Sequence, residues 1–478
     1  MAELEAVIGL EIHVQLSTRT KMFCGCELSF GDEPNVHTCP VCLAHPGVLP
    51  VPNEEAIGYA LKIAAALECE VAPRSIFHRK NYFYPDSPKA YQISQYDVPI
   101  AGAGRLGGVR IHRAHLEEDA AKMIHLGGSG RIHGSGASMV DFNRGGTPLV
   151  EIVTEPDLRS AAEAAAWARL LRTTVRQLDV SDVNMEEGSL RVDANVSVRP
   201  AGSEELGTKT ELKNMNSFRF LERGVEAELV RQLALIEAGG TVVQETLHFH
   251  PEDGSLTPLR SKEEAHDYRY FPEPDLVPLA PTEAMLREAR ESLPELPEAR
   301  LRRYSEEMGV AEDVATVLVA DPETADYFER AAGAATDVEP RVVANWVTGE
   351  LAAALRGDSG ESAGDSKVEP KALARLVTMV HEKKISHGSG KTVLSTLVAE
   401  GGDPQSIVER EGLAQISDSS ELESIVAAAV DANPEAAEQI RAGNQKAIGA
   451  IVGAVMKETK GRADGGEVNR LIRGKLGV

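Results

Sequence analysis

The sequence has few aromatic residues and no long apolar run. Phe, Trp and Tyr make up 4% of the 478 residues, and the longest late apolar stretch, at 447–456, is closed by Lys446 and Lys457. A membrane-spanning helix needs roughly 18 consecutive apolar residues, so we expect no membrane segment. The N-terminus carries Glu3 and Glu5 where a signal peptide would carry positive charge, which favours a cytoplasmic location.

Basic residues are also scarce relative to acidic ones, 50 against 74, and the formal net charge is −24. Non-specific binding of nucleic acid depends on dense Lys and Arg, so this balance argues against a protein that coats nucleic acid. The segment from Arg441 to Val478 has the opposite charge: it contains eight basic and three acidic residues, a net charge of +5. Such a segment is either a solvated helix face or a surface that contacts RNA.

Cysteine is rare, but four of the five cysteines fall within 19 residues, at Cys24, Cys26, Cys39 and Cys42. In a chain without an export signal disulfides are disfavoured, and this spacing is typical of a tetrahedral zinc knuckle. Four thiolates would leave no open coordination position, so the zinc would be structural rather than catalytic. Reduced thiols without a metal are the alternative interpretation.

Periodicity predicts an α+β protein. A helical stripe at 160–178 begins at a capping box from Ser160 to Glu163, and apolar and polar residues alternate as in strands at 7–16, 109–120, 148–155 and 190–199. After about residue 295 the sequence is rich in Ala, Leu and Glu, which are strong helix formers. We therefore predict a mixed-sheet cradle at 1–292, an all-α domain at 293–405 and a small α-helical tail domain at 406–478.

Two predicted strands carry polar groups on one face and aliphatic groups on the other. Side chains alternate along a strand, so Glu11 and His13 project together, as do Arg191 and Asp193. Carboxylates with a single imidazole suit a hard divalent ion such as Mg²⁺ better than catalytic zinc. Three lysines suit phosphate oxygens beside that ion, namely Lys80, Lys89 and Lys213. The residues alone leave two interpretations open: a magnesium-dependent phosphoryl or nucleotide site, or polar networks and ion pairs without chemistry.

Several longer motifs resemble a known family. They are Gly9-Leu-Glu-Ile-His-Val-Gln-Leu16, Tyr82-Phe-Tyr-Pro-Asp86, Gln92-Ile-Ser-Gln-Tyr-Asp97, Glu151-Ile-Val-Thr-Glu-Pro-Asp157, Met185-Glu-Glu-Gly-Ser-Leu190, Asp267-Tyr-Arg-Tyr-Phe-Pro-Glu-Pro-Asp275, and Val452-Gly-Ala-Val-Met-Lys457 followed by Lys460-Gly461. Together they are similar to the B subunits of the bacterial aspartyl/glutamyl-tRNA(Asn/Gln) amidotransferases, the GatB type of the GatB/GatE family. The resemblance runs from about residue 5 to the end of the chain.

The resemblance implies part of an enzyme that depends on ATP and Mg²⁺. The family phosphorylates the side-chain carboxylate of Glu or Asp misloaded on tRNA(Gln) or tRNA(Asn), and ammonia then replaces the phosphate. Ammonia comes from a glutaminase (amidase) partner, the A subunit, and a small third partner, the C subunit, completes a heterotrimer. The same resemblance implies that the cradle holds the kinase and transamidase site and that the tail domain binds tRNA.

The resemblance also implies roles for particular positions. Glu11, His13, Glu117 and Glu151 match the magnesium ligands, Asp193 matches a group that binds a second ion or guides ammonia, and Lys80 and Lys89 are the candidates for contacts with ATP phosphates. Alternation favours Glu117 over Glu118, because it places Glu117 on the same face as His115. Two other functions stay open: a stand-alone ATP-dependent ligase with its own ammonia source, and a non-enzymatic RNA-binding scaffold built on the zinc knuckle and the helical tail.

Overall fold

The computed structural model describes residues 3–126, 135–213, 215–260, 268–356, 363–414, 419–459 and 462–477. Asp267 and Lys460-Gly461 of the motifs above lie outside these ranges. The chain divides into two compact units, Met1–Pro297 and Glu298–Val478. A mixed sheet with helices makes up the first unit and helices make up the second, which confirms the predicted fold class. Within the described ranges, no helix has both the length and the apolar character needed to cross a membrane.

A mixed sheet organises the first unit, and the described residues give it eight strands in the order β12-β11-β10-β9-β1-β8-β5-β4. Only β10 and β11 run parallel, and the other neighbours are antiparallel. The four predicted strands are present as β1 (Leu4–Gln15), β5 (Val109–Glu118), β8 (Pro148–Thr154) and β9 (Leu190–Pro200). The remaining strands are β4 (Gly104–Leu106), β10 (Thr210–Lys213), β11 (Thr246–Phe249) and β12 (Leu256–Arg260).

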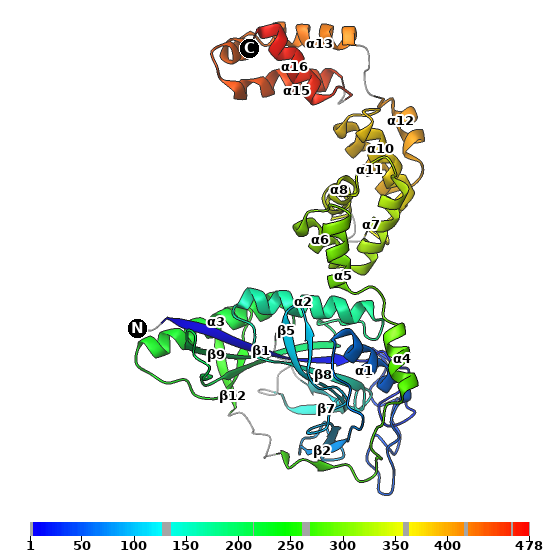
Figure 1. Cartoon of the computed structure of the whole chain (residues 1–478), viewed down its shortest axis with the longest axis vertical. Coiled ribbons are helices and arrows are strands. Elements are labelled where there is room, and N and C mark those ends of the chain that lie inside the picture. The colour runs from blue at the N-terminus through cyan, green and yellow to red at the C-terminus, as the bar shows by residue number, and fades with distance from the viewer. Residues whose placement is uncertain are drawn as a thin grey trace. The chain divides into compact units, whose positions relative to one another are not determined.

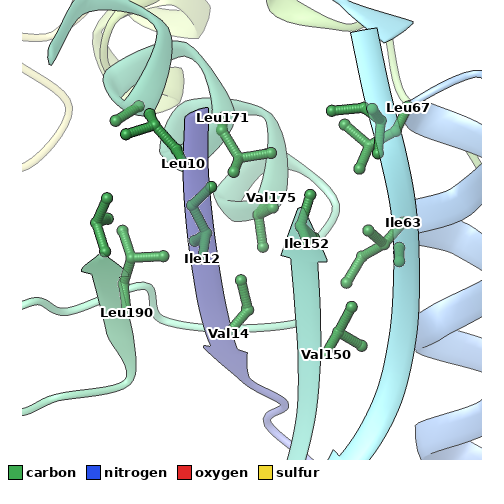
Figure 2. Packing of buried hydrophobic residues seen from close by; sticks show 14 of the residues in the cluster. Leu10, Ile12, Val14, Ile63, Leu67, Val150, Ile152, Leu171, Val175 and Leu190 are labelled. Atoms are coloured by element: carbon green, nitrogen blue, oxygen red, sulfur yellow. The ribbon is translucent and has the colours of Figure 1, made fainter. Parts of the chain in front are cut away.

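Aliphatic side chains on one face of this sheet form the core. Because side chains alternate, the even-numbered residues Leu10, Ile12 and Val14 of β1 all point to the same side, where they are buried. They pack with side chains of the neighbouring strands and of the covering helices, as Figure 2 shows for Val150, Ile152, Leu190, Leu171, Val175, Ile63 and Leu67. The odd-numbered residues of β1 therefore face the opposite side of the sheet.

Four helices belong to the first unit, among the described residues: α1 (Glu54–Ala66), α2 (Ala161–Gln177), α3 (Phe218–Glu237) and α4 (Glu283–Glu291). The predicted helix is α2, and its start is confirmed because the Ser160 side chain accepts a hydrogen bond from the backbone N–H of Glu163. In Figure 1, α2 and α3 lie above the sheet, whereas β2 and β7 lie below it. The polar face of the sheet is thus the face turned away from α2.

Two small sheets complete the first unit. One contains β13 (Phe271–Pro272), β2 (His78–Asn81) and β3 (Tyr91–Ser94), and the other pairs β6 (Lys122–Leu126) with β7 (Ala137–Asp141). Asn81 ties the first of them to the segment before β13, since its side-chain amide donates to the carbonyl oxygens of Tyr268 and Arg269, each at 2.9 Å.

The second unit is helical. Around one hydrophobic cluster, from Tyr304 to Leu413, lie α5 (Pro297–Arg302), α6 (Glu312–Val319), α7 (Pro322–Ala334), α8 (Pro340–Asn345), α9 (Ala352–Arg356), α10 (Pro370–His381), α11 (His387–Glu400) and α12 (Pro404–Glu411), with π-helical turns at Arg303–Glu307 and Trp346–Leu351. A separate cluster, from Leu422 to Leu476, joins α13 (Ser419–Ala432), α14 (Pro434–Arg441), α15 (Ile448–Glu458) and α16 (Gly465–Leu476), with a 3₁₀ turn at Gln445–Ala447. Each cluster provides its helices with a hydrophobic core of their own.

Candidate active site

The polar face of the large sheet collects residues that are far apart in the sequence. The strand β1 is paired on both sides, so that His13 lies opposite Glu151 of β8 and Glu11 lies opposite Asp193 of β9. On the far side of β8, His115 of β5 is also opposite Glu151. Antiparallel partners directly opposite one another bring their side chains into contact. The register therefore builds one continuous patch of carboxylates and imidazoles.

The four predicted magnesium ligands meet in this patch. His13 Nε2 lies 3.5 Å from Glu117 Oε1 and 3.5 Å from Glu151 Oε2. One ligand atom from each of Glu11, His13 and Glu151 can be chosen so that all three lie within 4.8 Å of one another, and the same holds for His115, Glu117 and Glu151. Oxygen donors dominate both sets, which fits a hard divalent cation.

Charge balance in the cluster explains why these groups tolerate burial. Burial lowers the pKa of His13, but contacts with the Glu151 and Glu117 carboxylates outweigh it and raise the pKa to about 9; those carboxylates likewise raise the pKa of His115 to about 9 against burial. Burial alone would raise the pKa of Glu151, yet the two imidazoles bring it well below its ordinary range. The Glu117 and Glu151 carboxylates are thus each stabilised by the two neighbouring imidazole groups.

Glu11 behaves differently from the other carboxylates. Burial, followed by the nearby charge of Glu151, raises its pKa above the ordinary value, so the charged carboxylate is less favoured here than in water. A divalent cation would favour the charged form. Since a histidine ligand has to be neutral, such an ion would also displace the proton of His13.

A cavity of about 540 Å³ opens over the patch. Of the predicted site residues, Glu11, His13, Lys80, Lys89, Glu117 and Asp193 line it, whereas Glu151 is 6% exposed and does not. Glu151 therefore lies beneath the cavity surface, where it contacts His13 and His115. The volume lies within the usual range for small-molecule sites.

The lysines of the cavity have unequal surroundings. Lys89 is paired with Glu118, the carboxylate beside the predicted ligand Glu117, and Lys213 Nζ lies 2.6 Å from Asp193 Oδ2. The Lys80 ammonium instead lies 4.8 Å from the centre of the Tyr268 ring. Burial lowers the pKa of Lys80, but the charges of neighbouring acidic groups outweigh it and raise the pKa, so the ammonium stays charged at neutral pH.

Some residues that line the cavity or contact its wall are absent from the predicted set. Arg191 lines the wall with Nη2 at 3.1 Å from Asp119 Oδ2, and Gln15 Nε2 donates to the same oxygen at 2.7 Å. The sequence could have predicted the positions of Gln15 and Arg191, because each shares the polar face of its strand with predicted site residues. His115 has the same signal, since it stands two positions before Glu117.

The four clustered cysteines form a second candidate metal site. Their sulfur atoms all lie within 4.8 Å of one another, and the sulfurs of Cys39 and Cys42 are 3.9 Å apart. A tetrahedral zinc with Zn–S bonds of about 2.3 Å separates its sulfurs by roughly 3.8 Å, whereas a disulfide bond is about 2.05 Å long. The geometry therefore fits a tetrathiolate metal site and excludes a disulfide between this pair.

A buried lysine supports this cysteine cluster. Lys21 is 1% exposed, and its Nζ donates to the carbonyl oxygen of Phe142 at 2.8 Å and lies 3.7 Å from Cys42 Sγ. A hydrogen bond from Cys24, assisted by the Lys21 charge, lowers the pKa of the Cys42 thiol to about 4. These contacts favour the thiolate form of Cys42, the form that binds metal. Cys42 also lines the 540 Å³ cavity, so the knuckle forms part of the wall of the candidate active site.

Comparisons with known proteins identify the family of the chain. Residues 6–287 match the family model described as the GatB/GatE catalytic domain, and residues 326–476 match the one described as the GatB domain. Proteins named as the B subunit of aspartyl/glutamyl-tRNA(Asn/Gln) amidotransferase are similar over almost the whole chain. The one from Brevibacillus brevis is 49% identical over 99% of both chains, and the one from Moorella thermoacetica is 50% identical over 99% of this chain and 100% of its own. The one from Carboxydothermus hydrogenoformans is 48% identical over 100% of this chain and 99% of its own. Because a family model matches more than half of the chain and these relatives are about half identical over nearly its full length, the chain belongs to the GatB/GatE family.

Proposed function

We propose that this chain is the B subunit of a glutamine-dependent amidotransferase. It would convert misacylated Glu-tRNA(Gln), Asp-tRNA(Asn) or both into Gln-tRNA(Gln) and Asn-tRNA(Asn). The observation that carries the proposal is the meeting of Glu11, His13, Glu117 and Glu151 under a cavity that also holds Lys80. Relatives that are about half identical over their full length bear the name of that activity.

The chemistry requires two steps on the same carboxylate. A carboxylate is a poor acceptor for ammonia, because an oxide or hydroxide would have to leave. In the first step an oxygen of the substrate carboxylate attacks the γ-phosphorus of ATP, the bond to the bridging oxygen breaks, and ADP leaves. In the second step ammonia attacks the acyl carbon, inorganic phosphate leaves with the bonding electrons, and the nitrogen loses a proton to give the amide.

The residues at and beneath the cavity surface fit these two steps. Glu11, His13, Glu117 and Glu151 would hold Mg²⁺, which neutralises phosphate charge and aligns donor and acceptor for in-line transfer. Lys80 brings a permanent positive charge to phosphate oxygens, and Lys89 would do the same once it exchanges Glu118 for a phosphate. Asp193, which accepts a hydrogen bond from Lys213, would accept another from incoming ammonia or bind a second ion.

The remaining expectations join the same proposal. Zinc in the site formed by Cys24, Cys26, Cys39 and Cys42 would be structural. A glutaminase partner, the A subunit, would deliver ammonia, the small C subunit would complete a heterotrimer, and the basic tail domain would bind tRNA in the cytoplasm. The relatives are named as B subunits, which supports the need for partner chains.

The test supplies the purified chain, alone and in its complex, with Glu-tRNA(Gln), ATP, Mg²⁺ and ammonium chloride, and measures glutaminyl product. We expect product from the wild type, and loss of product in Glu11→Gln and His13→Ala with tRNA binding retained. Glu226→Gln is the matched control, because Glu226 is exposed on α3 and does not line the cavity. Full activity of Glu11→Gln and His13→Ala would reject the assignment of the cluster.

The same assay separates the alternative functions. Amide formation from a free amino acid, ATP and ammonium without tRNA would favour the stand-alone ligase. Binding of tRNA without any ATP hydrolysis that depends on tRNA would favour the scaffold. Product from Asp-tRNA(Asn), measured in parallel, defines which substrates the chain accepts.

A further inference from the structure

Aromatic side chains gather at the mouth of the cavity. Six of the nine tyrosines fall in the two segments that build the small sheet β13-β2-β3, together with Phe83 and Phe271; they are Tyr82, Tyr84, Tyr91, Tyr96, Tyr268 and Tyr270. In a chain with 4% aromatic residues this concentration is not an effect of composition. Tyr82 and Tyr268 line the cavity itself, so the aromatic group adjoins the candidate active site.

Several of these rings are exposed rather than packed into a core. Phe83 is 85% exposed, Tyr84 45%, Phe271 43% and Tyr96 41%. A single exposed aromatic residue needs no explanation, but a group of them beside a cavity is typical of a contact surface. None of these four side chains lines the 540 Å³ cavity, but Phe83 and Tyr84 lie in the chain between Tyr82 and Asp86, which do.

The geometry of the rings suits stacking. The Tyr82 and Tyr84 rings are stacked with centroids 5.7 Å apart and an interplanar angle of 27°. The segment that carries them is anchored, because the backbone N–H of Tyr82 donates to the carbonyl oxygen of Ala90 at 3.0 Å and Asn81 bonds to the segment before β13. The Tyr82–Tyr84 pair is therefore organised before any ligand arrives, which lowers the entropy cost of binding to Tyr84.

We propose that Phe83 and Tyr84 bind the unpaired terminal base of the aminoacylated end of the tRNA by stacking, an inference that rests on the proposed function. The amino acid is esterified directly to the ribose of that nucleotide. About six bonds separate the carboxyl carbon of a glutamyl side chain from this ribose, a span of roughly 7 Å when extended. The esterified nucleotide would therefore stay close to a cavity whose wall includes Tyr82, two positions before Tyr84.

The adenine of ATP fits the rim less well as the occupant. The triphosphate and ribose separate it from the reacting phosphorus, so its position is not tied closely to the ligands. The Arg191 guanidinium on the cavity wall complements the phosphate that precedes the terminal ribose. Stacking on aromatic rings also tolerates different neighbouring sequences, because every base has a π-face. One platform would serve two different tRNAs.

The experiment compares binding of deacylated tRNA with and without its terminal adenosine to the full-length chain in its complex. We expect the wild type to lose roughly five- to tenfold in affinity when the adenosine is removed. Phe83→Ala and Tyr84→Ala should bind complete tRNA more weakly by a similar factor and should no longer respond to removal of the adenosine. Phe83→Tyr should bind complete tRNA as tightly as the wild type, and Phe83→Leu should bind it as weakly as Phe83→Ala, because only an aromatic ring stacks.

Phe30→Ala is the matched control, since Phe30 is 75% exposed and does not line the cavity. The inference is overturned if both alanine variants respond to the missing adenosine as the wild type does. It is equally overturned if they raise only the KM for ATP, which would assign the rings to the adenine of ATP. Formation of product by the wild type tests the proposed function separately. If the wild type forms product but the alanine variants bind tRNA as the wild type does, the proposed function stands and the stacking role of Phe83 and Tyr84 is rejected.

Discussion

The buried Lys21 offers a sharp test of the cysteine site. In Lys21→Met the side chain keeps its unbranched shape, one atom shorter, but loses its charge and its donor. The ammonium lies 3.7 Å from Cys42 Sγ, and at an effective dielectric constant of about 20 this attraction amounts to about 4 kcal/mol. Cys42 is only partly buried, so solvent screening lowers that figure. We expect zinc affinity to fall at least tenfold, which corresponds to about 1.4 kcal/mol.

A second effect of Lys21→Met has to be separated from the first. The substitution also removes the hydrogen bond to the Phe142 carbonyl at 2.8 Å, which leaves a buried acceptor unpaired at a cost of about 1–3 kcal/mol. Lys62→Met is the matched control, because Lys62 Nζ donates to the carbonyl oxygen of Leu178 at 2.7 Å. Both variants should lose stability in thermal unfolding, but only Lys21→Met should lose zinc.

The assay is competition for zinc with a chromogenic chelator, run on the wild type and on both variants. The reasoning is refuted if Lys21→Met, folded as well as Lys62→Met, retains wild-type zinc affinity. It is also refuted if the two variants lose zinc equally, since the effect would then come from general destabilisation. A result between these limits measures how much of the thiolate charge Lys21 neutralises.

Two further substitutions probe the polar wall and the helix that supports the sheet. Asp119→Ala removes the carboxylate that holds Arg191 at 3.1 Å, and we expect urea unfolding to show a loss of about 2 kcal/mol together with weaker ATP binding; unchanged values for both would contradict the role of this pair. Trp167→Phe removes the indole N–H that donates to the Leu106 carbonyl at 2.8 Å, with an expected loss of about 1–3 kcal/mol. Trp346 then remains as the single tryptophan reporter, and a Tm equal to that of the wild type would show the bond to be unimportant.

Alternation along strands was enough to predict which side chains share a face. It placed Glu11 with His13 and Arg191 with Asp193, and it favoured Glu117 over Glu118. In the structure Glu117 contacts His13, whereas Glu118 is paired with Lys89. Local periodicity carries this information because neighbouring side chains in a strand always point to opposite faces.

Pairing between distant strands could not be predicted in the same way. The partners of β1 lie about 140 and 180 residues further along the chain, and their register depends on tertiary packing rather than on local sequence. The contact of His13 with Glu151 and the burial of Lys21 follow from that packing. A lysine carries no sequence signal that it will be buried, since most lysines are exposed.

The position of β1 within the sheet has a consequence for movement during turnover. A strand hydrogen-bonded on both edges and backed by a packed apolar layer opens only when the whole unit unfolds, so its amides should exchange with deuterium among the slowest in the chain. The groups that Glu11 and His13 present are fixed in place before substrate arrives. The motion that admits reactants and releases products therefore has to come from the surrounding loops. Fast hydrogen–deuterium exchange at 82–90 would reveal it.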